Sequence, residues 1–321
     1  MTTTLRGNGG PWSPERILVT YSRDEGVVEI LRENRPDLKF RSKPAMDVTA
    51  DDLEWAQVFI GFQRPRPPGW GGVQWIHSTG AGVDRFLFRA ELPNNILLTR
   101  SPEDFGPQIG EYCVARALAV TQRLREFDTA QTERIWSGGV PDRLAGSRVV
   151  VVGTGQVGCG VARAFTRMDC VVDGVSLSGS PRDPFRMVTP WSEFPSVVEG
   201  AQWLVLAAPL TEDTWHLLDH EMLSLCDGVY LINVARGAFV DEASLPLALD
   251  RGWLSGAALD VFETEPLPSD SPLWGHPGVV ISPHCSGVTD VRAAALGFLE
   301  CLAALERGEL PGWVIDREAG Y

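Results

Sequence analysis

The sequence lacks any apolar run long enough to cross a membrane as a helix, so we expect no membrane association. Its first residues, MTTTLRGNGGPWSPE, are polar and contain no apolar core of the kind that a secretory signal peptide needs. The six cysteines include no C-x-x-C pair, which favours a reducing compartment and argues against a zinc site. We therefore predict a cytoplasmic protein with no bound metal.

Positive charge is also scarce. The chain has 28 Lys and Arg against 42 Asp and Glu, a formal net charge of −14, which argues against a nucleic-acid partner. An anionic ligand would then be bound by local positive groups. With 321 residues, 44% of them hydrophobic, the chain is long enough for two domains that each have a core.

The most informative stretch is RVVVVGTGQVG, where Arg148–Val152 predicts a buried parallel strand. Gly153, Gly155 and Gly158 then follow in the spacing G-x-G-x-x-G. The first glycine permits a tight turn, the second lets a pyrophosphate approach the backbone, and the third lets the next helix pack closely. A helix over Val157–Met168 would direct its N–H groups at the phosphates. The alternative is a plain glycine turn between a strand and a helix.

Strands and helices alternate along the chain, which predicts open, mostly parallel sheets. One long helix is expected over Glu103–Phe127, followed by a loop over Arg134–Asp142 that exposes Trp136, and a last helix over Thr289–Arg307. The helix pattern at the start covers Asp24–Asn34. The expected strands are Arg16–Tyr21, Leu38–Arg41, Val58–Phe62, Val73–His77, Ile96–Thr99, Arg148–Val152, Cys170–Leu177, Trp203–Ala207, Val229–Val234, Gly256–Phe262 and Val279–Ser282.

We expect an α/β fold: two Rossmann-like, doubly wound parallel-sheet domains with the active-site cleft between them. We expect a discontinuous substrate-binding domain over residues 1–102 and 288–321, and a dinucleotide-binding domain over residues 103–287.

Three polar residues, Arg236, Glu265 and His284, follow predicted strands of the second domain. The carboxyl ends of parallel strands form the ligand crevice, so these side chains can converge beside a cofactor. A histidine paired with a carboxylate can deliver a proton near neutrality, and an arginine can clamp a carboxylate. Together they suit reduction of a 2-keto acid. Taken singly, each has an ordinary alternative: a core histidine, a helix cap or a solvated acid.

The segments NVARG, DVFETEPLP and SPH, downstream of GTGQVG, resemble the signatures of the D-isomer-specific 2-hydroxyacid dehydrogenases. The resemblance extends over nearly the whole chain, with STGAGVD, GEYCVARAL and APLTEDTWHLL in matching order. It implies that Arg236 binds the substrate carboxylate and carbonyl, that His284 is the acid/base, and that Glu265 orients His284. It also implies that backbone N–H groups of Ala81 and Gly82 hold the carboxylate.

The same resemblance implies a homodimer, with the Trp136 loop reaching the neighbouring subunit or plugging the interface. It places a nicotinamide cofactor against Gly153, Thr154, Gly155, Gln156, Val157, Gly158, Pro209, Thr214, Val234, Ala235, Asp260, Ser286 and Gly287.

The sequence contains features of both NAD-binding and NADP-binding proteins. Asp173 has the spacing of the acidic residue that binds the NAD ribose, whereas the family pattern puts Ser176 at that position. The segment SLSGSPR resembles the loops of NADP-using members, and Ser178 and Arg182 would join Ser176 at a 2′-phosphate. We expect a preference for NADP(H), with NAD(H) as the alternative.

The interpretation is an NAD(P)H-dependent reductase of a small 2-keto acid, of the glyoxylate or hydroxypyruvate type, that yields the D-2-hydroxy acid. The loop from Gln63 to Trp70 is expected to face the substrate tail, with Gln63 or Arg64 as contacts. One rival is a dinucleotide-sensing protein of the corepressor type with little turnover. Another is a glycine-motif methyltransferase, which leaves Arg236, Glu265 and His284 unexplained.

Overall fold

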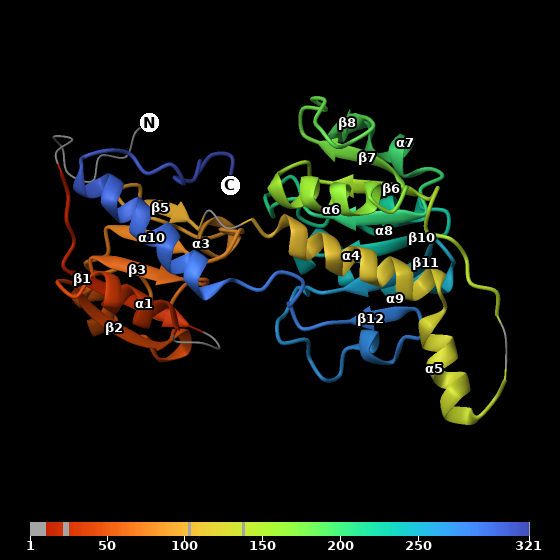
Figure 1. Ribbon diagram of the computed structural model, residues 1–321, viewed down its shortest axis with the longest axis horizontal. Coiled ribbons are helices and arrows are strands. Elements are labelled where there is room, and N and C mark those ends of the chain that lie inside the picture. Colours follow the sequence, from red (N-terminus) through yellow and green to blue (C-terminus); the bar gives the residue numbers. More distant parts are fainter. Residues whose placement is uncertain (1–10, 22–25, 102–103, 137–138, 321) are drawn as a thin grey trace. The chain divides into compact units, whose positions relative to one another are not determined.

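The computed structural model describes residues 11–21, 26–101, 104–136 and 139–320, and the account of the fold is confined to these (Figure 1). Contacts within the chain divide it into two units. The first contains the described residues of 1–103 and 289–321, and the second contains those of 104–288.

The first unit is built on a five-stranded parallel sheet with the order β2-β1-β3-β4-β5. The strand order reverses direction between β1 and β3, as in doubly wound folds. The strands are β1 (Arg16–Tyr21), β2 (Lys39–Pro44), β3 (Val58–Gly61), β4 (Trp75–Ser78) and β5 (Leu97–Arg100).

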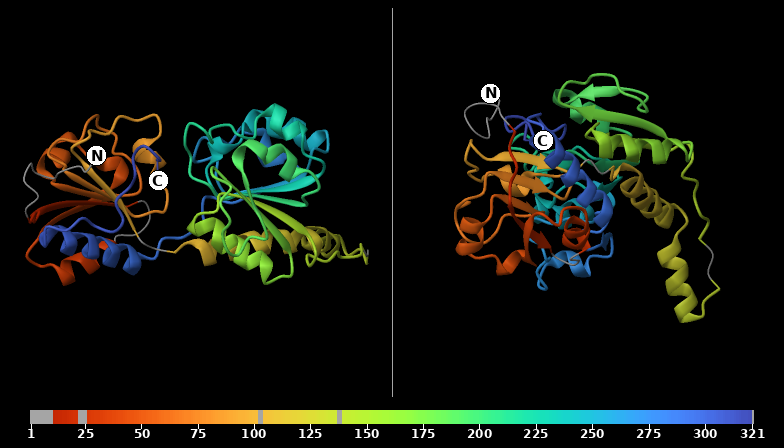
Figure 2. Two further views of the ribbon diagram at one scale, coloured as in Figure 1. Left: turned by 90° about the horizontal axis from the view of Figure 1, so that it is seen from above. Right: turned by 60° about the vertical axis from the view of Figure 1, so that its left-hand side comes forward.

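Alternate residues of these strands supply two separate cores, because successive side chains of a strand point to opposite faces. Ile17 and Val19 enter one core, whereas Leu18 enters the other. Helices α1 (Gly26–Asn34) and α10 (Val291–Glu306) lie on the same side of this sheet (Figure 2).

The contribution of α10 to the first unit is large, although this helix lies about 200 residues beyond the last strand of its sheet. Phe298 stacks on Trp75 of β4 with ring centroids 4.8 Å apart, and both side chains are fully buried. Ala295, Cys301 and Leu302 belong to the same core. The last helix therefore completes the core on one face of the sheet.

The second unit contains a seven-stranded parallel sheet with the order β12-β11-β10-β9-β6-β7-β8. The order reverses between β6 and β9, which places the loop after β6 at the switch point where such sheets bind ligands. The strands are β6 (Arg148–Val152), β7 (Val171–Ser176), β8 (Val188–Pro190), β9 (Trp203–Leu206), β10 (Val229–Asn233), β11 (Leu254–Leu259) and β12 (Val279–Ile281). The expected α/β class with two parallel sheets is confirmed.

Helices α4 (Gly106–Thr121) and α6 (Gln156–Thr166) pack together on one face of this sheet (Figure 2). Glycines bring their backbones into contact. A Cβ placed on Gly160 would lie 2.3 Å from the Cα of Gly106, and one on Gly110 would lie 2.9 Å from the Cβ of Ala164. The two helices can approach this closely only where side chains are absent.

The other helices are short, apart from α5. They are α2 (Ala50–Trp55), α3 (Asp84–Leu87), α5 (Leu124–Glu133), α7 (Phe194–Val198), α8 (His220–Ser224) and α9 (Leu245–Asp250). Single 3-10 turns follow several strands, among them η3 (Gly237–Phe239) and η4 (Glu242–Ser244). Among the described residues, no helix is both long and apolar enough to span a membrane.

The expectation of one helix over Glu103–Phe127 is wrong. The helix breaks into α4 and α5 at Arg123, which has a left-handed φ of 54°. The break is stabilised from outside, because the carbonyl of Thr121 accepts a hydrogen bond from the backbone N–H of Asp142, 2.7 Å away. None of the residues of α5 is buried, and Trp136 beyond it is fully exposed. Strand β8 was not expected, and the starts of two expected helices, Asp24 and Glu103, lie outside the described residues.

The glycine contact between α4 and α6 makes a direct prediction about stability. Gly160→Ala inserts a methyl group where the backbone of Gly106 already lies, and we expect it to lower the free energy of unfolding by about 1–3 kcal/mol. Gly275→Ala is the matched control, because a Cβ there meets nothing within 4 Å. Urea unfolding of both variants checks this, and equal midpoints would contradict the proposed contact.

Candidate active site

Each of the three glycines after β6 occupies a different structural environment. Gly153 has a φ of +100°, which side-chain-bearing residues rarely adopt, and a Cβ there would lie 2.7 Å from the backbone of Ala207. A Cβ on Gly158 would lie 1.8 Å from the carbonyl oxygen of Gly153. A Cβ on Gly155 would meet no atom of the protein within 4 Å.

The open space at Gly155 fits a dinucleotide. Gly155 precedes the first residue of α6, Gln156, and no side chain caps the N–H groups of that helix. Free N–H groups and the helix dipole favour an anion at this point. The loop therefore leaves the backbone at Gly155 open and its helix N–H groups without a side-chain cap, as the approach of a pyrophosphate requires, and Thr154, Gln156 and Val157 lie within the same turn.

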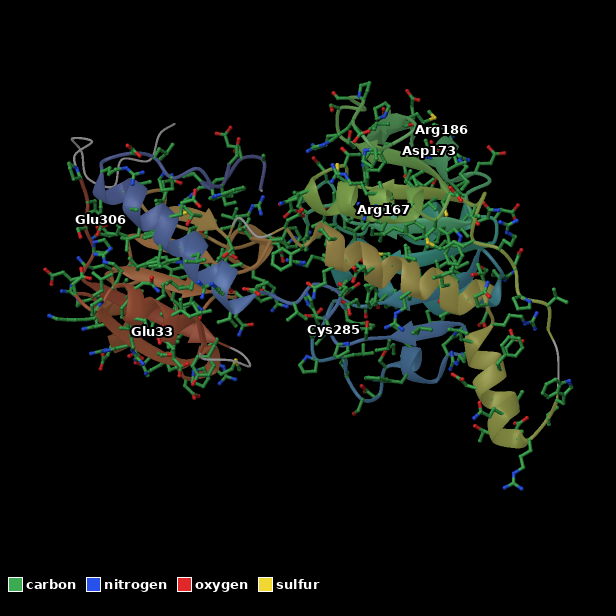
Figure 3. All side chains as sticks on the ribbon, in the orientation of Figure 1. Glu33, Arg167, Asp173, Arg186, Cys285 and Glu306 are labelled. Atoms are coloured by element: carbon green, nitrogen blue, oxygen red, sulfur yellow. The ribbon has the colours of Figure 1, made fainter. Side chains whose placement is uncertain are left out.

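Asp173 is fully buried within β7, and its carboxylate is engaged by two arginines (Figure 3). Arg186 donates from Nε at 2.8 Å and from Nη2 at 2.6 Å, while Arg148 donates from Nε at 3.0 Å. Burial of a carboxylate is tolerated because of such charged partners. The side chain that has the spacing of an NAD ribose ligand thus has a structural role inside the sheet.

Ser176 ends β7, and its Oγ accepts a hydrogen bond from the N–H of Gly179 at 3.1 Å. In the following loop, Ser178 donates to the Oγ of Ser180 at 2.9 Å, and Arg182 is exposed. Leu177 is 66% exposed and brings no polar group. The loop after β7 therefore presents hydroxyl groups and the cation of Arg182, followed by exposed Asp183 and by Arg186, which is bound to Asp173.

The other residues expected at the cofactor follow β9, β10 and β12. The Oγ1 of Thr214 donates to the carbonyl of Pro209 at 2.8 Å, which closes the turn after β9. Val234 and Ala235 are buried directly after β10. After β12, the Ser286 N–H is bound by Asp260, and a Cβ on Gly287 would lie 3.1 Å from Ile109 of α4.

Arg236 lies three residues beyond the end of β10, and Asn233 holds the turn that leads to it. The Asn233 side chain donates to the carbonyl of Arg236 at 3.0 Å and accepts from the N–H of Ala235 at 3.1 Å. The Arg236 guanidinium, partly exposed, donates to the carbonyl of Ala235 at 2.6 Å. The last residue of the strand thus holds the backbone turn that leads to this arginine.

Glu265 and His284 form a direct pair. The Nδ1 of His284 lies 2.9 Å from Oε2 and 3.1 Å from Oε1 of Glu265. A carboxylate only accepts hydrogen bonds, so Nδ1 carries a proton and the imidazole is oriented by the glutamate. The Oε1 atom also accepts from the N–H of Phe262 at 3.2 Å, which holds Glu265 in turn.

The backbone around His284 is held by Asp260, which is fully buried directly after β11. His284 has a left-handed φ of 50°, an uncommon conformation for a residue with a side chain. Its N–H donates to the Asp260 carbonyl at 2.8 Å, and the Asp260 carboxylate accepts from the N–H groups of Cys285 and Ser286 at 3.0 and 2.8 Å. The Oγ of Ser282 donates to it at 2.6 Å.

Sequence reasoning missed a further member of this arrangement, Tyr112 of α4. Its hydroxyl lies 2.6 Å from the Oγ of Ser282, and because that Oγ donates to Asp260, the tyrosine must be the donor. Burial raises the pKa of Tyr112, so the hydroxyl stays protonated. Its position in the segment GEYC was the available signal, but nothing local indicates a partner 170 residues away.

Ala81 and Gly82 lie in the first unit, in the loop after β4, where both are half-buried. The preceding glycine is constrained, because a Cβ on Gly80 would lie 2.5 Å from the ring of Phe62. The structure thus pairs Glu265 with His284, places Arg236 in the same unit, and places Ala81 and Gly82 in the other unit. Their role in holding a carboxylate stays a prediction.

The geometry of the second unit has a counterpart among known proteins. The NAD-binding domain of the D-isomer specific 2-hydroxyacid dehydrogenases matches residues 114–286. The chain belongs to this family. The glyoxylate/hydroxypyruvate reductase A of Serratia proteamaculans is 33% identical over 259 residues, which cover 78% of this chain and 82% of that protein.

Solved structures of other members agree over almost the full length. A D-isomer specific 2-hydroxyacid dehydrogenase from Xanthobacter autotrophicus, in complex with NADPH and MES, has a TM-score of 0.82 at 31% identity and covers 97% of this chain and 100% of its own. An NADPH-dependent glyoxylate/hydroxypyruvate reductase from Sinorhizobium meliloti, in complex with NADP and sulfate, has a TM-score of 0.84 at 26% identity, with 96% and 100% covered. The protein is thus an NAD(P)-dependent 2-hydroxyacid dehydrogenase by family.

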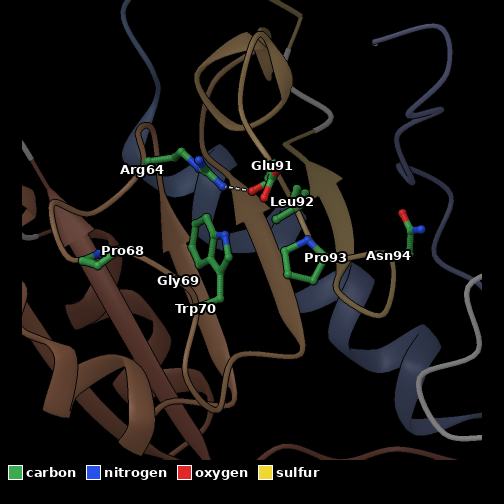
Figure 4. Close-up of a pocket in the computed structure, with 8 residues that line it drawn as sticks. All are labelled: Arg64, Pro68, Gly69, Trp70, Glu91, Leu92, Pro93 and Asn94. Atoms are coloured by element: carbon green, nitrogen blue, oxygen red, sulfur yellow. Dashed lines mark hydrogen bonds between the residues drawn. The ribbon is translucent and has the colours of Figure 1, made fainter.

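The first unit of this dehydrogenase has a cavity of about 570 Å³ beside the loop from Gln63 to Trp70 (Figure 4). Arg64 lies over the Trp70 ring, 5.5 Å from its centroid, and donates to the carbonyl of Glu91. Gln63 accepts from Arg85 at 3.4 Å. Arg64 is therefore held by its own unit, and a contact with a substrate tail stays a prediction for both residues.

With His284 as the proton donor expected from the sequence, keto-acid reduction would require the protonated imidazole, and the Glu265–His284 pair then predicts its pH dependence. Glu265→Gln replaces the carboxylate by an amide, which stabilises an imidazolium less. We expect lower turnover and an alkaline limb of the reductive profile that moves to lower pH. The rate from acid to alkaline pH measures this, with NADPH affinity as the control. An alkaline limb at the wild-type pH would mean that Glu265 only packs against the ring.

Proposed function

We propose that the protein reduces a small 2-keto acid of the glyoxylate or hydroxypyruvate type to the D-2-hydroxy acid. The observation that carries this proposal is the Glu265–His284 pair, 2.9 Å apart, in the same unit as the glycine loop and Arg236. The Serratia relative is named a glyoxylate/hydroxypyruvate reductase, and so is the Sinorhizobium structure, which supports this substrate class.

In this proposal, His284 holds the proton to be transferred at Nε2, because its Nδ1 proton is donated to Glu265. Arg236 holds the substrate carboxylate and polarises the carbonyl through its fork of N–H donors. The nicotinamide, when bound, supplies the hydride. The carbonyl carbon gains the hydride, the carbonyl oxygen gains the His284 proton, and Glu265 stabilises the imidazolium before transfer.

The partner expected of this enzyme is a second copy of the chain. Trp136, three residues beyond the end of α5, is fully exposed, and Ile135 and Val140 in the same segment are 53% and 86% exposed. Exposed apolar side chains gathered on one segment favour a protein interface. We therefore propose a homodimer that covers this segment.

The test of the proposed function is turnover of glyoxylate and hydroxypyruvate with NADPH by the purified protein. His284→Asn should lower kcat by about 10²- to 10⁴-fold, the usual contribution of a general acid, and should leave NADPH binding intact. Near-normal turnover by the variant would contradict the assignment of His284. A wild type that binds NADPH without turning over either acid would favour the dinucleotide-sensing alternative.

We also propose that NADPH is the preferred cofactor. The Asp173 carboxylate is buried between Arg148 and Arg186, which leaves Ser176 at the end of β7 as the residue at the ribose position. A neutral hydroxyl does not repel a 2′-phosphate, and exposed Arg182 supplies a positive charge. The Xanthobacter and Sinorhizobium structures hold NADPH and NADP, which supports the proposal.

A single substitution tests the cofactor preference. Ser176→Asp places a carboxylate where it accepts from a ribose hydroxyl and repels a phosphate, and we expect the ratio of kcat/KM values to move toward NADH by about tenfold, the equivalent of about 1.4 kcal/mol. Both cofactors are compared with one keto acid. A wild-type preference for NADH would overturn the proposal, and Leu177→Ala serves as the neutral control in the same loop.

A further inference from the structure

Two glutamates in the second unit bind each other's backbone reciprocally. The N–H of Glu242, the first residue of η4, donates to Oε1 of Glu263 at 3.2 Å. The N–H of Glu263 donates in return to Oε1 of Glu242. Two separate loops are thereby joined at one point by two charge-assisted hydrogen bonds, which are stronger than neutral ones.

His216 adds a third loop to this point. Its Nε2 lies 3.0 Å from Oε1 of Glu263, and its ring stacks on Trp215 with centroids 4.1 Å apart. The N–H of His216 donates to the carbonyl of Ala238 at 2.8 Å. We call Glu242, Glu263 and His216 the carboxylate clip.

The two glutamate loops each lead to a residue of the proposed site. Glu263 lies two positions before Glu265, and Glu242 lies six positions after Arg236. Where the loops meet, a Cβ on Gly237 would lie 1.8 Å from the carbonyl carbon of Phe262, so their backbones are in direct contact. A shift of one loop along the other would change the distance from Arg236 to the Glu265–His284 pair.

We propose that the carboxylate clip is a positioning device that aligns Arg236 with the Glu265–His284 pair. This inference rests on the proposed function. Misplacement of a binding group by about 1 Å costs as much as 10²-fold in rate, so loss of one of the two reciprocal backbone bonds of the clip has a measurable effect.

The carboxylates at the clip repel one another, so we expect its hydrogen-bond geometry, and not its charge, to align the site. Burial raises the pKa of Glu242, and the carboxylates of Glu263 and Glu265 raise it further, while the N–H of Glu263 and His216 lower it. Three carboxylates in one region repel one another, which is an unfavourable arrangement for stability alone. An amide oxygen can accept the same hydrogen bond without the charge.

The decisive comparison is therefore between Glu242→Ala and Glu242→Gln. The alanine variant removes the acceptor of the Glu263 N–H, and we expect kcat for glyoxylate reduction to fall by about 10- to 100-fold with NADPH affinity unchanged. The glutamine variant keeps the acceptor and should recover most of that loss, with the wild-type pH profile. Glu199→Ala, an exposed glutamate of the same unit, is the matched control and should behave as wild type.

The outcomes separate the possible roles. Equal losses of kcat in the alanine and glutamine variants would show that the negative charge of Glu242 is required, and not the hydrogen bond that it accepts. That result would overturn the proposal. A fully active alanine variant, or one whose melting temperature and NADPH affinity fall together with kcat, would overturn it as well. Oxamate binding to the NADPH-loaded protein is measured as well, because this binding does not depend on turnover. A wild type that turns over neither acid would contradict the proposed function. Even then, oxamate binding that is weaker in Glu242→Ala than in the wild type and in Glu242→Gln would support the positioning role of the clip.

Discussion

The candidate site of the second unit depends on the hydrogen bonds that the Asp260 carboxylate accepts. A buried carboxylate is costly unless its oxygens are hydrogen-bonded, and here the Ser282 hydroxyl and the N–H groups of Cys285 and Ser286 satisfy it. These bonds surround His284, whose left-handed backbone would otherwise relax. Orientation of the histidine backbone thus begins with Asp260, whose carboxylate is bonded to groups of the protein on both sides of it.

Much of the fold could be predicted from the sequence because several strands, among them β3, β9 and β10, are continuous buried runs. The valines of β6 have no polar alternation, as burial on both faces requires, and the expected bounds of this strand agree with the structure. The break at Arg123 could not be predicted in the same way. Apolar residues continue at helical spacing through it, and the hydrogen bond that stabilises the break comes from Asp142, outside the helix.

In the candidate site, the sequence identified residues that directly follow strands. It did not identify the residues that hold them in place. Glu265 and His284 were identifiable because strand ends converge in parallel sheets, and the structure pairs them. Tyr112, which donates to Ser282, and Glu242, which we propose as a support, are polar residues on a helix and in the 3-10 turn η4, where a solvated side chain is the ordinary expectation. Only the folded chain brings them to their partners, across separations that no local pattern encodes.

The position of α10 has a consequence for the order in which the protein acquires its structure during synthesis. A ribosome completes residues 104–288 before it reaches Phe298, and domains generally fold as units as they emerge. The sheet of the first unit, made earliest, must therefore wait with one face of Trp75 uncovered while the second unit folds. Exposed apolar surface of this kind is what chaperones bind, so the part of the chain that is made first is the last to be finished.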